Sequence, residues 1–163
     1  MQLFSSFPKI VYNGQLITNI TIRLDFIQRI KNNLSIFQYV QIQHAQRPED
    51  IAEIYYNDPT LYWIVLFMND IVDPYYDWLL TDDQLWTFVN AKYSDPYSIH
   101  HYISTSNNVL GAGIIVDSIT SDKTAVTNLA YEQAQNELKR KVKILKQEYI
   151  AQVLSEYQNE LKR

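Results

Sequence analysis

After Gly113 the chain contains neither glycine nor proline, the two residues that most readily interrupt a helix. Within this stretch, residues 127–163 carry apolar side chains at steps of three and four residues, a spacing that places them on one helix face. The stripe consists of Leu138, Val142, Leu145, Tyr149, Val153, Tyr157 and Leu161. The pattern predicts a long C-terminal amphipathic helix, about 50 Å over residues 128–161 at 1.5 Å per residue.

Such a helix is longer than the domain that would carry it, because a compact chain of 163 residues is about 40 Å across. The segment must therefore protrude, break or be covered by another protein. Its charge also differs: residues 132–163 sum to +2, the rest to −6, and the whole chain to −4. We expect this helical arm to form a partner interface through Tyr131, Leu138, Val142, Leu145, Tyr149, Val153 and Tyr157. The alternative is that the stripe folds back on the central part of the same chain.

Composition excludes several classes of function. The absence of cysteine rules out disulfides, thiolate catalysis and Cys-ligated zinc. With only 3 glycines a Gly-rich phosphate loop is not expected, and the negative charge argues against nucleic-acid binding. The 13 tyrosines favour a binding or assembly protein, since tyrosine is enriched at protein interfaces.

Neither a signal peptide nor a membrane span is predicted. Residues 1–12 have one basic residue, Lys9, and no long apolar run. The longest apolar run in the chain, residues 61–68, is far shorter than the roughly 20 residues that a spanning helix needs. We therefore expect no membrane insertion, and synthesis in a reducing compartment.

Residues 1–37 are predicted to form an extended segment that can add to a partner. Residues 9–12 favour a short strand, and Asn13-Gly14 is a turn signal. Residues 20–25 alternate between apolar and polar, as in a half-buried strand, but residues 22–30 also fit a helix. The periodicity leaves both structures open.

Residues 38–93 form the predicted central module. A strand over 38–43 precedes a helix that begins near Pro48, and a second helix over 61–69 is apolar on nearly all sides, so it should be buried. A further helix begins at Thr81. The expected core residues are Tyr39, Ile51, Ala52, Trp63 and Trp78. Residues 94–126 are predicted to be a linker with short strands.

Part of this module resembles a LysM domain, which has the order strand, helix, helix, strand. The matching residues are Tyr39, Val40, Gln41, Ile42, Ile51, Ala52, Tyr55, Leu61, Trp63, Asn69, Asp70, Ile71, Asp73 and Pro74. The Gly-Asp-Thr/Ser turn of sugar-binding LysM domains is replaced here by Ala45-Gln46-Arg47-Pro48. The resemblance therefore implies a packing module, with peptidoglycan or glycan binding as the alternative.

A wider resemblance runs over nearly the whole chain. In order, the residues that carry it are Phe7-Pro8-Lys9, Asp58-Pro59, Tyr62-Trp63, Met68-Asn69-Asp70-Ile71, Asp73-Pro74, Tyr76-Asp77-Trp78, His100-His101-Tyr102, Tyr131-Glu132, Asn136-Glu137, Lys139-Arg140 and Val142. This set resembles the LysM-like baseplate wedge protein of contractile-tailed bacteriophages. The family usually has Trp-Pro where this chain has Trp78-Leu79.

The resemblance implies an α+β chain that is a structural subunit of a tail baseplate wedge. Such a subunit would be made in the host cytoplasm and become part of the virion. It would join neighbouring wedge components or attach them around the central hub. Its partners would be other wedge proteins and hub or sheath-initiating proteins, in multiple copies within a symmetric assembly.

No enzyme, cofactor or metal site is predicted. His100 and His101 are neighbours, and adjacent residues of a strand point to opposite faces, so one ion would not bind both. The acids Asp70, Asp73, Asp77, Asp82 and Asp83 lack the spacing of a calcium loop and are better explained as helix caps. Early-helix acids such as Glu49 have no reason for a raised pKa, which a glycosidase acid requires.

Overall fold

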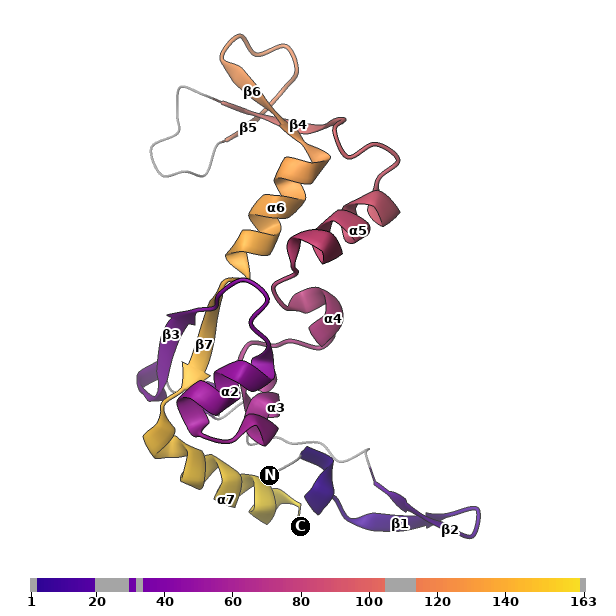
Figure 1. The fold of residues 1–163 in the computed structure, drawn as a ribbon, viewed down its shortest axis with the longest axis vertical. Coiled ribbons are helices and arrows are strands. Elements are labelled where there is room, and N and C mark those ends of the chain that lie inside the picture. The colour runs from indigo at the N-terminus through magenta and orange to yellow at the C-terminus, as the bar shows by residue number, and fades with distance from the viewer. Residues whose placement is uncertain (1–2, 20–29, 32–33, 105–113, 162–163) are drawn as a thin grey trace. The chain divides into compact units, whose positions relative to one another are not determined.

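The computed structural model describes residues 3–19, 30–31, 34–104 and 114–161 (Figure 1). Helices and strands are mixed through the chain, which confirms the α+β class. The chain divides into two compact units. The first combines Met1–Trp78 with Lys141–Arg163, and the second is Leu79–Arg140. These boundaries fall inside the expected segments 38–93 and 127–163.

The first unit is built on a two-stranded antiparallel sheet whose strands lie far apart in sequence. Strand β3 (Phe37–Gln41) pairs with β7 (Lys141–Leu145), so that Phe37 faces Leu145 and Gln41 faces Lys141. Helices α2 (Pro48–Tyr56) and α3 (Tyr62–Met68) pack against each other, and α3 packs against β7 (Figure 1). The residues with the largest fully buried side chains in this unit are Ile42, Ile51, Trp63, Ile64, Val65, Met68, Ile144, Leu145 and Tyr157.

Local signals place the helices of the first unit where the sequence indicates. Pro48 is the first residue of α2, and the Asp50 carboxylate accepts a hydrogen bond from the Arg47 N–H at 2.8 Å. Asn57 ends α2 in the left-handed conformation, with φ of 54°. Asp58 caps the 3₁₀ turn η3 (Pro59–Leu61), and Asp73 caps the short helix α4 (Pro74–Asp77).

The prediction of one long C-terminal helix is wrong, because the segment breaks. It consists of helix α6 (Asn128–Leu138), strand β7, the turn η4 (Gln147–Tyr149) and helix α7 (Ile150–Glu160). In the middle, Val142 and Ile144 alternate with Lys141 and Lys143, which suits a strand with one buried face. Both valine and isoleucine are β-branched, so pairing with β3 and burial outweigh the weak local helix preference.

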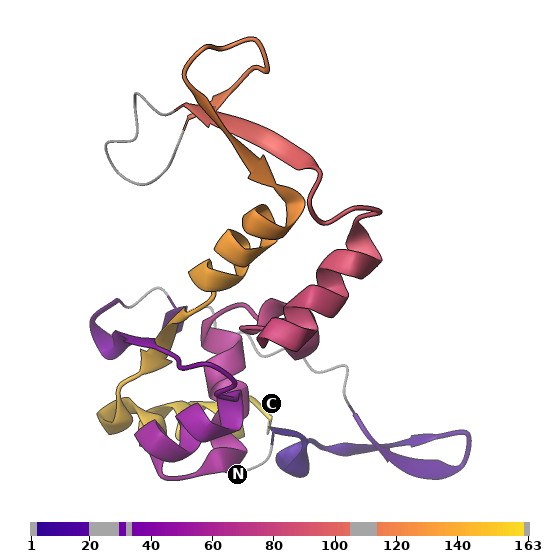
Figure 2. The ribbon, with the colours of Figure 1, turned by 45° about the horizontal axis from the view of Figure 1, so that its top comes forward.

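The second unit contains a three-stranded sheet and two helices. The strand order is β5 (Ile115–Val116), β4 (Ile99–Ser104), β6 (Lys123–Thr127), with both pairs antiparallel. Helix α5 (Asp82–Lys92) lies beside α6 (Figure 2). Thr81 caps α5 and Thr127 caps α6 through their side-chain oxygens. The small core consists of Leu80, Leu85 and Val89, with Phe88, Tyr93 and Leu129 against it.

The N-terminal segment contains a β-hairpin that follows the short turn η1 (Leu3–Ser6). Strands β1 (Lys9–Tyr12) and β2 (Gln15–Thr18) pair antiparallel through the predicted turn. Asn13 and Gly14 both have positive φ, 48° and 77°, which a tight hairpin turn of this hand requires. The two predictions for residues 20–25 and 22–30 fall largely outside the described residues. In the part of the chain that is described, no helix has the length and apolar character to cross a membrane.

Candidate partner interface

Most of the predicted interface stripe lies inside the chain's own core. Val142, Leu145, Val153 and Tyr157 are 3, 0, 2 and 0% exposed, respectively. These four side chains are therefore unavailable to a partner, and their assignment to an interface is corrected. The apolar spacing was sound evidence for burial, but the surface that covers these residues belongs to the first unit itself.

The other three predicted interface residues are more accessible. Tyr131 and Tyr149 are half-buried, and Leu138 is 72% exposed at the end of α6. Leu138 and Tyr131 belong to the second unit, and Tyr149 belongs to the first. Strand β7 separates helices α6 and α7 in the sequence, so residues 128–160 do not form one continuous helical interface.

Tyr157 ties α7 to the N-terminal part of the first unit. Its ring centroid lies 5.1 Å from that of Trp63 and 6.4 Å from that of Phe7. Its hydroxyl donates a hydrogen bond to the Leu3 carbonyl, and burial raises the pKa of this hydroxyl above its usual value. Tyr157 of α7 thus belongs to an internal aromatic cluster and is not exposed to a partner protein.

Of the predicted module core, four residues are buried and one is not. Ile51, Ala52, Trp63 and Trp78 are between 0 and 7% exposed. The Trp78 indole N–H donates to the Gln46 carbonyl at 2.8 Å. Tyr39 is 61% exposed, so its core assignment is wrong.

Tyr39 is exposed because the two faces of the β3–β7 sheet differ. Val142 and Ile144 of β7 point into the core. Tyr39 lies on the other face of the sheet, together with Lys141 and with Lys143, which is opposite Tyr39 on β7. The Lys141 ammonium lies 4.7 Å from the centre of the Tyr39 ring, as a cation–π contact. This face is therefore basic and aromatic.

Two side chains form hydrogen bonds with the backbone groups of β7 that face away from β3. The Asn69 amide donates to the Lys143 carbonyl at 2.7 Å, and its oxygen accepts from the Lys143 N–H at 2.7 Å. The Tyr56 hydroxyl accepts from the Leu145 N–H at 3.1 Å, and burial raises the pKa of Tyr56 to about 12. The N–H and C=O of Lys143 and the N–H of Leu145 are therefore not available to a further strand at this edge.

The β1–β2 hairpin is the largest cluster of exposed apolar side chains in one described element of the first unit. Val11 is 73% exposed, Leu16 65%, Tyr12 63%, Ile10 41% and Ile17 40%. Val11 faces Leu16 on one side of the hairpin, and Ile10 faces Ile17 on the other. Both faces of the hairpin are therefore apolar, as expected for an element that another protein covers.

In the second unit a buried carboxylate, that of Glu132, is held in its charged form by neighbouring hydrogen-bond donors. Glu132 is 7% exposed and accepts hydrogen bonds from the Lys92 ammonium and the Tyr93 hydroxyl, both at 2.7 Å. Burial raises the pKa of Glu132, but the hydrogen bonds from Lys92 and Tyr93 outweigh it, so the pKa lies below its ordinary value. A carboxylate held in its charged form is a structural group and not a general acid.

The adjacent histidines do not point to opposite faces, contrary to the strand-based expectation. The pairing of β4 with β6 shifts register between Ile99 and His101, which is a β-bulge. The bulge brings the two histidine Nδ1 atoms to 2.8 Å, and His100 stacks on Tyr131 with 4.0 Å between ring centroids. Among the described residues, no group of three or more potential ligands could hold a metal ion.

Two comparisons with known proteins show what this chain is similar to. A family model described as base plate wedge protein 53 matches residues 3–108. Baseplate wedge protein gp53 of Enterobacteria phage T4 is 37% identical over 54 residues. That alignment covers 33% of this chain and 28% of the phage T4 protein, so the chain matches less than a third of its relative's length.

Proposed function

Because the chain belongs to the base plate wedge protein 53 family, we propose that it is a structural subunit of a phage tail baseplate that joins neighbouring wedge components or attaches them around the hub. Its place is then in the virion, and its partners are other wedge proteins and hub or sheath-initiating proteins. It acts through protein–protein interfaces and not as an enzyme. The observation that carries the proposal is the apolar hairpin inside the matched region.

The hairpin needs a partner on energetic grounds. An isolated two-stranded hairpin is marginally stable in water, and this one exposes apolar side chains on both faces. Burial of Val11, Tyr12 and Leu16 at an interface would remove apolar area from water, at roughly 25 cal/mol per Å². A large part of this hairpin's stability would then come from the wedge component that covers it.

The first unit supports a LysM-like module used for packing. Its order is strand β3, helix α2, helix α3, strand β7, and the two strands pair antiparallel. The closing strand is supplied after residues 79–140, which form the second unit. We therefore propose a LysM-like module that is interrupted by an insertion and serves as a scaffold for the interfaces.

The test is a binding assay of the full chain against the other baseplate wedge proteins of the same phage. A double variant, Val11→Thr with Leu16→Thr, removes apolar area from one face of the hairpin and places threonine, which favours strands, at both positions. A matched control, Ile115→Thr with Ile119→Thr, changes two apolar residues that are 71 and 88% exposed in the second unit.

We expect the hairpin variant to bind its wedge partner about tenfold more weakly, because two apolar contacts of the interface are lost. The control should bind like the unchanged chain. Equal binding by the hairpin variant and the unchanged chain would contradict the assignment of the hairpin as the interface. No binding of the unchanged chain to any wedge protein would contradict the proposed function.

A further inference from the structure

The two edges of the β3–β7 sheet differ, and the difference can be read from its hydrogen bonds. In an antiparallel pair, residues alternate between those whose backbone groups face the partner strand and those whose groups face away. The Lys143 N–H and C=O face Asn69, and the Leu145 N–H faces Tyr56, so both residues face away from β3. One residue further on, the Lys146 N–H donates back to the Ile36 carbonyl at 2.9 Å, in phase with this alternation.

The alternation fixes the backbone direction on β3 as well. Tyr39 is opposite Lys143, and Phe37 is opposite Leu145, so both turn their backbone groups away from β7; Gln41, opposite Lys141, does the same. Within the described residues, no hydrogen bond reaches the N–H or C=O of Tyr39. Strand β3 is therefore an open edge, whereas β7 is closed by side chains.

An open edge usually carries a feature that prevents unwanted pairing, such as a proline or a bulge. Strand β3 has neither, since its sequence is Phe-Gln-Tyr-Val-Gln and its register with β7 is regular. Three of its five side chains, Gln38, Tyr39 and Gln41, are exposed, whereas Phe37 is buried and Val40 is half-buried. The edge is therefore suited to accept a further strand.

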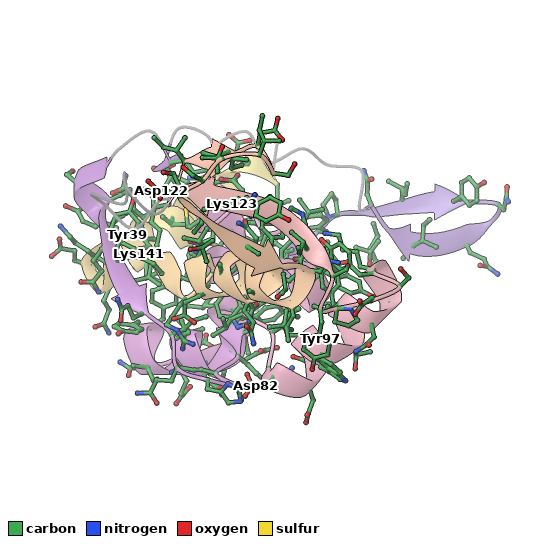
Figure 3. All side chains as sticks on the ribbon, turned by 90° about the horizontal axis from the view of Figure 1, so that it is seen from above. Tyr39, Asp82, Tyr97, Asp122, Lys123 and Lys141 are labelled. Carbon is green, nitrogen blue, oxygen red and sulfur yellow. The ribbon has the colours of Figure 1, made fainter. Side chains whose placement is uncertain are left out.

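The charge beside this edge selects the partner. Lys141 lies over the Tyr39 ring at 4.7 Å, and Lys143 lies over the Phe37 ring at 4.8 Å (Figure 3 labels Tyr39 and Lys141). Both ammonium groups are thus held above the edge strand, one strand spacing from any added strand. Among the described residues, no carboxylate forms an ion pair with Lys141 or Lys143.

We propose that the open edge of β3 binds an extended, acidic segment of another baseplate protein as a third strand of the sheet. The added strand would take up the backbone groups of Tyr39 and Gln41, and its carboxylates would face Lys141 and Lys143. The identity of the partner as a baseplate protein rests on the proposed function. The chain's own strands β1 and β2 contain no carboxylate, so a second copy of the hairpin does not fit this chemistry.

The first experiment uses model peptides and so does not depend on the proposed function. The full chain, labelled for NMR, is titrated with a short peptide of alternating valine and glutamate and with its lysine counterpart. We expect the amide signals of Tyr39 and Gln41 to shift with the glutamate peptide, and the lysine peptide to bind about tenfold more weakly. Absence of these shifts, or equal binding of both peptides, would overturn the proposal.

Charge-reversal variants provide the matched control. Lys141→Glu with Lys143→Glu removes the basic face without changing the backbone ladder, and should weaken the glutamate peptide about tenfold. Lys123→Glu is the control, because the Lys123 ammonium also lies over a tyrosine ring, that of Tyr102, at 4.8 Å, but in the second unit. Equal weakening by both variants would show a bulk charge effect and overturn the proposal.

Amide hydrogen exchange then tests the same edge in the assembly. In a mixture with wedge proteins that bind the chain, the Tyr39 amide should exchange about tenfold more slowly than in the chain alone. Binding without this protection would overturn the edge proposal and leave the proposed function standing. Protection that instead increases with the concentration of the chain alone would identify a second copy as the occupant and overturn the acidic partner.

Discussion

Asn69 and Lys143 are joined by two hydrogen bonds, both 2.7 Å, between the side-chain amide of one and the backbone of the other. The amide also donates to the Val65 carbonyl at 2.8 Å, at the end of α3. Asn69 therefore fixes the C-terminal end of α3 to strand β7, although the whole second unit lies between them in the sequence. Together with the β3–β7 pairing, this residue connects the two separate pieces of sequence that form the first unit.

Replacement of Asn69 by alanine should destabilise the first unit by about 1–3 kcal/mol, because the Lys143 N–H and C=O lose their partners in a partly buried place. The measurement is the free energy of unfolding in urea. Asn90→Ala is the matched control, since Asn90 is an exposed asparagine whose amide donates to the Trp86 carbonyl of its own helix. If the two variants lose equal stability, Asn69 does not have the connecting role described.

Trp63→Ala should cost about 3–5 kcal/mol in the free energy of unfolding, because a large side chain that is 2% exposed leaves a cavity. The ring contacts with Phe67 and Tyr157 would be lost as well. Trp86→Ala is the control, with a side chain that is 44% exposed, and it should cost about 1 kcal/mol or less. A loss below about 1 kcal/mol for Trp63→Ala would refute its place in the core.

The stability of the second unit should fall with acid through Glu132. Its pKa in the folded chain lies below the ordinary value of 4.5, so the folded state favours the charged form. The stabilisation is therefore complete above pH 4.5 and is lost as the pH falls through the folded-state pKa. We expect Glu132→Gln to be less stable than the unchanged chain at pH 7, with a smaller difference in acid.

The measurement is the free energy of unfolding in urea, for Glu132→Gln and for the unchanged chain, from neutral pH down to the lowest pH at which the chain is still folded. Glu53→Gln serves as the control, because Glu53 is an exposed carboxylate of α2 in the first unit. A difference between Glu132→Gln and the unchanged chain that stays constant with pH would contradict the role given to the Glu132 carboxylate.

Gly14→Ala should weaken the hairpin by about 1 kcal/mol, because alanine at a φ of 77° is strained. The cost comes from the backbone alone, since a Cβ at this position meets no atom within 4 Å. Amide exchange in β1 and β2 should become faster, while exchange in α3 stays unchanged. Unchanged exchange in the hairpin would show that the turn does not depend on this glycine.

Elements that depend on neighbours in sequence were predictable. The Asn13-Gly14 turn, the start of α2 at Pro48 and the buried helix around Trp63 all occur where their signals lie. Each depends on local chemistry, such as a positive φ, a missing N–H or a continuous apolar run. These signals do not need information about the rest of the chain.

The interface assignment was not predictable from the same kind of evidence. Val142 and Ile144 fit both a helix stripe and a strand, and the choice depends on pairing with β3, about a hundred residues earlier in the sequence. The face on which Tyr39 lies depends on the register with β7, which the sequence around Tyr39 does not determine. The alternation of lysine with β-branched residues over 141–144 was the available signal for the strand.

The discontinuity of the first unit has a consequence for biosynthesis. Ribosomes add about 5–20 residues per second, and β7 and α7 emerge only after the whole of the second unit. Until then, helix α3 lacks strand β7, against which it packs, and Trp63 lacks the ring of Tyr157. The second unit is contiguous and can fold first, while the nascent N-terminal part stays incomplete, so a chain truncated before β7 should be bound by chaperones or aggregate instead of yielding a smaller functional subunit.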